Sequence, residues 1–320
     1  MHEIFINDFG RLRSGWRLLI FLAAFILLAM LLTNLLRVLY VLTGPHGPSG
    51  AADIIAEFVY RGALLGAALG AGYFCTRLLE GLPWRSLGLT FHAGWLRDLI
   101  FGFGIGFATL VVAVAIASKG LKFSLGNTGW LWIVRSGIGS GALLFVAALA
   151  EEAMFRGYGL QTLTRAKLAW LGVLLTSVPF ALVHLNNPNV VRGVTFANTA
   201  LAGVWLAAAY LRTRSLWLAV GVHWSWNWAL GWFFGIPVSG MTVVSNPLLE
   251  AQDIGPKWLT GGTYGIEGGV ACTIALILFT AFMWKSSWLS ATPELKQMTS
   301  EENPAISEPV ISIRPADHQA

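Results

Sequence analysis

Two adjacent glutamates and an arginine lie at the end of a strongly apolar stretch, in the octapeptide AEEAMFRG that begins at Ala150. An ionisable side chain in lipid hydrocarbon costs about 2.5 to 3.5 kcal/mol on insertion scales, so such residues usually face a bundle interior or a wet cavity. Either this group carries out chemistry, or it is a charge cluster at a helix end near the membrane surface.

Helical spacing predicts different roles for the two glutamates. Glu152 and Arg156 are i, i+4 and can pair on one helix face, with the acid N-terminal to the base. Glu151 lies about 140° of helical rotation away from Arg156. We therefore expect Glu152 to be structural and Glu151 to be an unpaired carboxylate, as a general base requires.

Two more i, i+4 pairs fall in apolar segments, Phe180 with His184 and His223 with Asn227. A lone histidine in an apolar helix is more often a packing residue. Two of them beside a glutamate and an asparagine favour a catalytic site. The remaining histidines lie in polar ends or connectors, at His2, His46, His92 and His318.

Depth along the helices supports a meeting of Glu151 and His184. If a turn near Lys167 joins two antiparallel helices, Glu151 lies 16 residues before that turn and His184 lies 17 after it. Both side chains are then expected at one level. His223 is less well placed, because it comes early in its own apolar run, and its helix must begin deeper or tilt.

The composition predicts an all-α, polytopic membrane protein. The chain has 320 residues, of which 56% are hydrophobic and only 12% charged, and it contains repeated runs near the length that spans a bilayer. We expect about eight transmembrane helices around a polar intramembrane cavity, within a domain at 1–285, and a disordered cytoplasmic tail at 286–320. The predicted helices are 18–40, 54–75, 99–117, 136–156, 168–185, 194–211, 216–234 and 269–284.

The charge distribution sets an expected orientation. The formal net charge is +5, but Lys and Arg are scattered at helix ends, which argues against nucleic-acid binding. Fourteen of them fall at the termini and the connectors on the same side, against six on the other, so both termini are expected in the cytoplasm. The first apolar run is too long for a signal peptide and is read as a retained span. Cys75 and Cys272 match no disulfide framework and are expected to be buried thiols.

The second predicted helix carries Asp53, Glu57 and Arg61 on one stripe. The stripe is either a satisfied polar seam against another helix or a lining of the cavity that holds Glu151. The seam is favoured because Glu57 and Arg61 can neutralise each other.

Tryptophans cluster around the His223 segment. As an interfacial belt they would anchor the helix at the headgroup level. As pocket walls they would exclude water or receive an apolar substrate segment. The belt is favoured for most of them, and Trp224 and Trp228 are the better pocket candidates because they share a face. The tryptophans are Trp217, Trp224, Trp226, Trp228 and Trp232.

The three motifs together resemble the signature of a known family. In chain order they are Glu151-Glu152-x-x-x-Arg156, Phe180-x-x-x-His184 and His223-x-x-x-Asn227. Each is weak alone, but in this order and in apolar segments they resemble the CPBP family of intramembrane endopeptidases, the Abi-type group of CAAX prenyl and bacteriocin-processing proteases. The phrases FRG at 155–157 and SLW at 215–217 look like its bacterial branch.

The resemblance implies an intramembrane glutamic protease without a cofactor. In such a protein Glu151 and His184 activate a water, and His223 with Asn227 binds the oxyanion. Glu152, Arg156 and Phe180 support the site. The expected partners are the lipid bilayer and a protein or peptide substrate, in some relatives a lipidated tail. The expected location is a bacterial plasma membrane.

Two alternatives stay open. Glu151, His184 and His223 form a permissible three-ligand set for a catalytic zinc, although the compact His-Glu-x-x-His signature is absent. A non-catalytic scaffold could use the same polar cavity to hold a partner segment. A transporter is disfavoured, because the chain shows no duplicated pair of broken helices.

Overall fold

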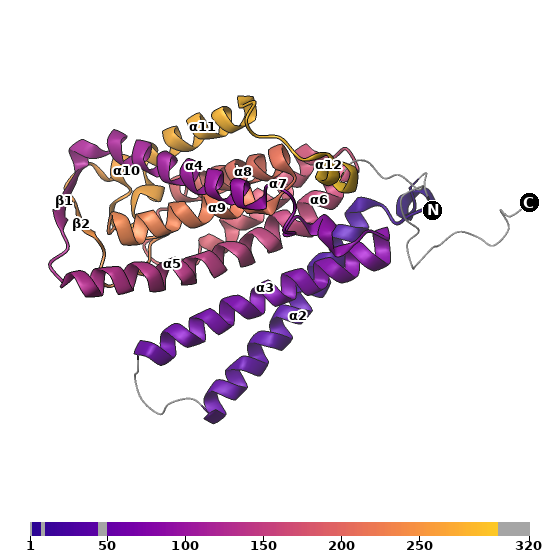
Figure 1. Cartoon of the computed structure of the whole chain (residues 1–320), viewed down its shortest axis with the longest axis horizontal. Helices are drawn as coiled ribbons and strands as arrows, with labels where there is room; N and C mark the ends of the chain where they lie inside the picture. Colours follow the sequence, from indigo (N-terminus) through magenta and orange to yellow (C-terminus); the bar gives the residue numbers. More distant parts are fainter. Residues whose placement is uncertain (1, 8–9, 44–49, 300–320) are drawn as a thin grey trace, which may run out of the picture. The chain divides into compact units, whose positions relative to one another are not determined.

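The computed structural model describes residues 2–7, 10–43 and 50–299, and nearly all of its regular structure is helical (Figure 1). The chain forms two compact units, which are described separately. Unit 1 comprises Met1–Thr90, Leu149–Gly172 and Thr292–Ala320, and unit 2 comprises Phe91–Ala148 and Val173–Ala291. Two helices, α5 (Trp130–Glu152) and α7 (Ala169–His184), begin in one unit and end in the other.

Unit 1 is built on a helical hairpin. The helices α2 (Ser14–Thr43) and α3 (Gly50–Glu80) lie side by side (Figure 1) and pack with the short α6 (Tyr158–Arg165). The core between them is apolar, and the Phe21 and Tyr158 rings lie 5.2 Å apart at their centroids. The smaller elements of this unit are α1 (His2–Phe5), the 3₁₀ turn η1 (Trp84–Leu87) and α12 (Pro293–Thr299).

A buried polar cluster joins the ends of these helices. Arg17 at the start of α2 donates from Nη1 to Oε1 of Glu80 at the end of α3, at 2.7 Å. Thr162 donates to the same oxygen at 2.6 Å, and Arg165 pairs with the other. Because a buried charge that loses its partner is strongly destabilising, this cluster fixes the relative position of α2, α3 and α6.

The chain passes from α5 to α7 through an irregular segment. A π-helical turn, η3 (Ala153–Gly157), follows α5 directly and leads into α6. Lys167 then adopts a positive φ of 61°, and Leu168 donates from its amide to the Leu163 carbonyl at 2.8 Å. This left-handed residue ends the helix, and it confirms the predicted turn near Lys167.

Unit 2 centres on two helices in close contact, α4 (Trp95–Ile116) and α9 (Leu216–Trp228). A Cβ added at Gly102 would overlap the Leu218 carbonyl, and one added at Gly221 would overlap the Leu99 carbonyl. Gly106 lies equally close to α9. The spacing Gly102-x-x-x-Gly106 is the small-residue pattern that lets two membrane helices approach backbone to backbone. It therefore fixes α9, which carries His223 and Asn227.

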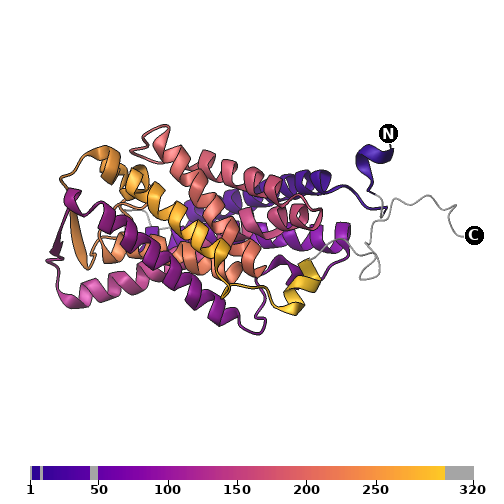
Figure 2. The same cartoon turned by 90° about the horizontal axis from the view of Figure 1, so that it is seen from above.

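The remaining elements of unit 2 surround this pair. The helices α8 (Val194–Thr213) and α11 (Val270–Lys285) pack together, and α11, in yellow, runs next to α4 (Figure 2). Two strands, β1 (Leu121–Leu125) and β2 (Leu249–Asp253), form an antiparallel ribbon. The short elements are η2 (Ser118–Gly120), η4 (Ala229–Phe233), α10 (Lys257–Thr260), η5 (Gly262–Tyr264) and η6 (Ile266–Gly268).

All eight predicted helices form within the described residues. Five helical segments are long and apolar enough to cross a bilayer, and α7 and α11 are apolar but shorter, at 16 residues each. The predicted helix at 216–234 is α9 followed by the π-helical η4. The chain is thus an integral membrane protein with an all-α bundle, and Cys75 and Cys272 are buried thiols as predicted.

The predicted tail differs in its first part. Residues 293–299 form α12, whose Leu295 side chain is fully buried, because it packs with η1 and α6 inside unit 1. Disorder therefore does not describe these residues. The remainder of the predicted tail, 300–320, lies outside the described residues.

Candidate active site

The structural acid of the first motif is Glu152. Its Oε1 accepts from Nη1 of Arg156 at 3.1 Å, and both side chains are completely buried. Glu152 immediately precedes the π-helical turn that follows α5, and Arg156 lies within that turn. A π-bulge of this kind is common at functional sites. The ion pair predicted from i, i+4 spacing is therefore present.

The prediction that Glu151 is unpaired is wrong. Nη1 of Arg61, on α3, lies 3.4 Å from its Oε1. Sequence spacing missed this contact because the two residues are 90 positions apart. Glu151 nevertheless differs from its neighbour, since its side chain is 20% exposed while that of Glu152 is fully buried.

The stripe on α3 contains the predicted local pair and one further contact, with Glu151. Arg61 donates from Nε to Oε1 of Glu57 at 2.7 Å, as the spacing predicted. Its second nitrogen reaches Glu151, so the stripe also lines the surroundings of that residue. The side chain of Asp53 lies outside the described part of the structure.

His184 ends α7 with a defined tautomer. Its Nδ1 lies 2.7 Å from the Phe180 carbonyl oxygen, one turn earlier. A carbonyl can only accept, so Nδ1 carries the proton and donates it. In a neutral imidazole the other nitrogen, Nε2, then has a lone pair. His184 is accordingly arranged to accept a proton at Nε2.

Phe180 contacts both histidines of the predicted site. Its ring centroid lies 4.5 Å from that of His184 and 6.1 Å, edge to face, from that of His223. His223 is buried on α9, and Asn227 follows one turn later and is half-buried. Unit 2 thus brings His184 and His223 to one aromatic ring.

The predicted site residues are divided between the two units. Unit 1 contains Glu151, Glu152 and Arg156, and unit 2 contains Phe180, His184, His223 and Asn227. Convergence of Glu151 with the two histidines and the asparagine joins the units and stays a prediction. The same holds for the zinc alternative. Within either unit, the described residues include no group of three His, Cys, Asp or Glu side chains arranged to hold a metal ion.

Glu267 supports α9 and was missed by the sequence analysis. Trp226 of α9 donates from its indole to Oε1 of Glu267 at 3.0 Å, and the Ser239 amide and hydroxyl both donate to Oε2. Asn187, just after His184, donates to the Ser239 carbonyl at 3.1 Å. One carboxylate therefore links α9 to the loops near His184. The usable signal was an acid followed by two glycines, Glu267-Gly268-Gly269, inside an otherwise apolar region.

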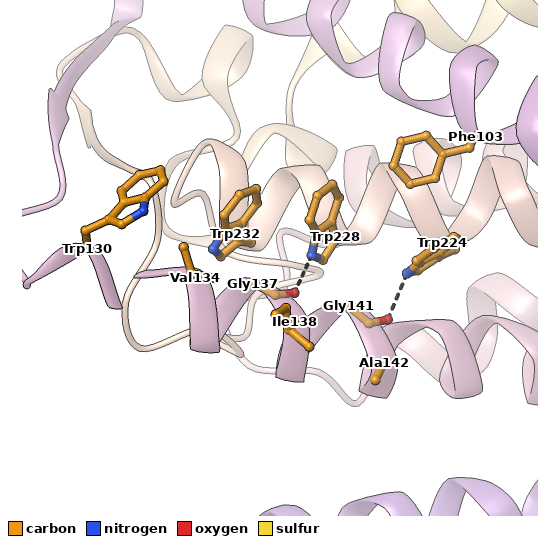
Figure 3. Close-up of a pocket in the computed structure, with 10 residues that line it drawn as sticks. All are labelled: Phe103, Trp130, Val134, Gly137, Ile138, Gly141, Ala142, Trp224, Trp228 and Trp232. Atoms are coloured by element: carbon orange, nitrogen blue, oxygen red, sulfur yellow. Dashed lines mark hydrogen bonds between the residues drawn. The ribbon is translucent and has the colours of Figure 1, made fainter. Parts of the chain in front are cut away.

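Three tryptophans hold α9 and η4 against α5. Trp224, Trp228 and Trp232 donate from their indole nitrogens to three backbone carbonyls, at 2.8 to 2.9 Å. The acceptors, spaced four residues apart on α5, are Gly141, Gly137 and Ile133. Figure 3 shows the first two of these bonds.

The rings of these tryptophans line an apolar pocket of about 380 Å³ (Figure 3). Because the three indole N–H groups already bond to carbonyls, these rings offer apolar faces to an occupant. The lining residues are Phe103, Trp130, Val134, Gly137, Ile138, Gly141, Ala142, Trp224, Trp228 and Trp232. The pocket prediction for Trp224 and Trp228 is confirmed. The belt prediction is wrong for Trp217 and Trp226, which are buried.

The fold and these residues define a class: an integral membrane protein whose helices carry acidic, imidazole and carboxamide side chains. Residues 136–229 match the family model described as type II CAAX prenyl endopeptidase Rce1-like. All seven predicted site residues lie within this segment, and over these residues the match confirms the family resemblance inferred from the motifs. A comparison with curated proteins finds no match.

Proposed function

We propose that this protein is a metal-free intramembrane endopeptidase that cleaves membrane-associated or lipidated protein tails. The observation that carries the proposal is the division between the adjacent acids, one locked to Arg156 and the other partly exposed. It is supported by the Nδ1–H tautomer of His184 and by the Rce1-like match over the same residues.

In this proposal Glu151 and His184 remove a proton from a water molecule, and the resulting hydroxide attacks the scissile carbonyl carbon. The carbonyl oxygen becomes an oxyanion, which accepts hydrogen bonds from His223 and Asn227. Such a donor is worth about 3 to 4 kcal/mol of transition-state stabilisation. When the C–N bond breaks, the proton taken from water passes to the leaving amine.

The apolar pocket supports a substrate with an apolar portion. Trp224 and Trp228 directly follow His223 and Asn227 on α9, so the proposed oxyanion site and the pocket wall use the same two turns. An apolar chain bound against these rings would bring its attached peptide to His223 and Asn227. The pocket lining offers aromatic and aliphatic surface, as a lipid group requires.

The test compares Glu151→Gln with Glu250→Gln, a matched change at an exposed residue of β2. Purified protein in detergent or nanodiscs is assayed on lipidated and unlipidated peptides. We expect Glu151→Gln to lower kcat by about 100-fold or more at unchanged thermal stability, and Glu250→Gln to keep wild-type activity. A fully active Glu151→Gln protein would refute the proposal and favour a scaffold.

The zinc alternative is decided in the same preparation. Activity that persists after chelation, in protein without stoichiometric zinc, is the expected result. A stoichiometric ion that is lost together with activity, with both restored by added zinc, would replace the metal-free mechanism by a metalloprotease using Glu151, His184 and His223.

We also infer that both termini face the cytoplasm, from the bias of Lys and Arg between the two sides, and that the membrane is a bacterial plasma membrane, from the phrases that resemble the bacterial branch. Reporter fusions at residue 320 test this. A reporter that is active only in the cytoplasm should be active there, and a periplasm-specific reporter should be silent. The reverse pattern would overturn the orientation.

A further inference from the structure

Arg61, which lies outside the three motifs, forms an ion pair with Glu151. It projects from α3, and its guanidinium contacts two carboxylates through different nitrogens. Nε donates to Glu57 at 2.7 Å, and Nη1 lies 3.4 Å from Glu151. We infer that Arg61 is a positioning residue for Glu151, an inference that rests on the proposed function.

The guanidinium geometry supports this role. The fork is planar and rigid and stays charged at every accessible pH, so Arg61 cannot itself act as acid or base. Glu57 is one turn earlier on the same helix and takes the shorter bond. The orientation of the fork is therefore set by α3, and Nη1 is left to face Glu151.

The difference in the two distances has a functional meaning. A short, bidentate pair would hold a carboxylate tightly and weaken it as a base. At 3.4 Å the charge of Arg61 acts on Glu151 mainly through space. This contact aims the carboxylate, while its oxygens remain able to accept a proton from water.

Exposure separates this cluster from a structural ion pair. The side chains of Glu57, Arg61 and Glu151 are 42%, 27% and 20% exposed. Both side chains of the Glu152–Arg156 pair are, by contrast, completely buried. A cluster that is less buried than the structural pair, and that includes the proposed base, is better explained by its effect on Glu151.

The decisive variants are Arg61→Met, which removes the charge at similar length, and Arg61→Lys, which keeps the charge but loses the fork. We expect Arg61→Met to lower kcat by about 10- to 100-fold with KM unchanged, because a displaced base slows the chemical step and leaves binding intact. Arg61→Lys should recover part of this loss. Arg77→Met, at an exposed arginine of the same helix, is the matched control and should behave as wild type.

Two readouts separate positioning from folding. The midpoint of thermal unfolding should be the same in Arg61→Lys and wild type, even though kcat differs. Wild-type kcat in both Arg61 variants would overturn the inference, as would a rise in KM at constant kcat. If Glu151→Gln is inactive while Arg61→Met is fully active, this inference fails alone. If Glu151→Gln is active, the proposed function fails with it.

Discussion

Two neighbouring glutamates on one helix have opposite surroundings in this protein. Glu152 is completely buried and has Arg156 of its own segment as its partner. Glu151 is partly exposed and faces Arg61, which another helix supplies and which Glu57 also holds. Residue type alone therefore does not assign a role to a glutamate here. Its burial, and whether its partner comes from the same helical segment or from another helix, decide whether losing the contact destabilises the fold or changes the chemistry.

The largest effect expected from this comparison is at the buried pair. Arg156→Met leaves the Glu152 carboxylate buried without its partner, which costs about 3 to 5 kcal/mol. We expect a large drop in the thermal midpoint and poor recovery from the membrane. Glu151→Gln, one residue from Glu152, is the control and should unfold as wild type does. Equal stability of the two variants would contradict the assignment of Glu152, and not Glu151, to a structural role.

Two uncharged sites on α5, Gly137 and Gly139, test the effect of burial on stability without any change of charge. A Cβ at Gly137 would overlap the Trp232 ring, whereas one at Gly139 meets nothing within 4 Å. Gly137→Ala should destabilise by about 1 to 3 kcal/mol through overpacking. Gly139→Ala should be neutral or stabilise by up to about 1 kcal/mol, since alanine is the better helix former. Thermal unfolding of both variants checks this, and equal midpoints would contradict it.

Arg61→Met should lower stability less than Arg156→Met does, because the partners of Arg61 are partly exposed whereas Glu152 is completely buried. The measurement is the same thermal unfolding series used for Arg156→Met. A loss as large as that of Arg156→Met would place both arginines in the same structural class and remove the contrast between the two glutamates.

The smallest effect expected concerns Tyr264, outside the membrane-spanning helices. Burial, and to a lesser extent the nearby Glu267 carboxylate, raise the pKa of its phenol above the ordinary value of 10.0. The phenolate therefore forms first in the unfolded chain. The stabilising contribution is complete below pH 10 and is lost as the pH rises toward the folded-state pKa.

At pH 10 the loss from Tyr264 is about 0.4 kcal/mol. Unfolding midpoints measured between pH 8 and about pH 11 should fall for wild type and fall less steeply for Tyr264→Phe. Parallel curves for the two proteins would show that this phenol does not carry the pH dependence.

Sequence patterns predicted the local features of the molecule well. The helix positions, the turn at Lys167 and the pairs at Glu152–Arg156 and Glu57–Arg61 all follow from spacing within one or two turns of helix. These features depend on periodicity and on neighbouring side chains, which a single sequence contains.

Long-range contacts were not predictable in the same way. The approach of Arg61 to Glu151 and of Glu267 to Trp226 depends on which helices pack together, and no local spacing encodes that. The tryptophans show the same limit. An indole N–H is satisfied equally well by an interfacial water or by a helix carbonyl, and only the packing of α9 against α5 decides between them.

The indole bonds between α9–η4 and α5 restrict the lengths of insertion that α5 can accept. Donors and acceptors both recur every four residues, slightly more than one helical turn, so the two helices can match only in steps of four residues. Insertion of one to three residues between Ile133 and Gly141 would leave at least one indole without its acceptor. A four-residue insertion would shift the register by a whole repeat and keep it. The three indole bonds therefore tolerate a shift of one four-residue repeat between the helices and no smaller shift.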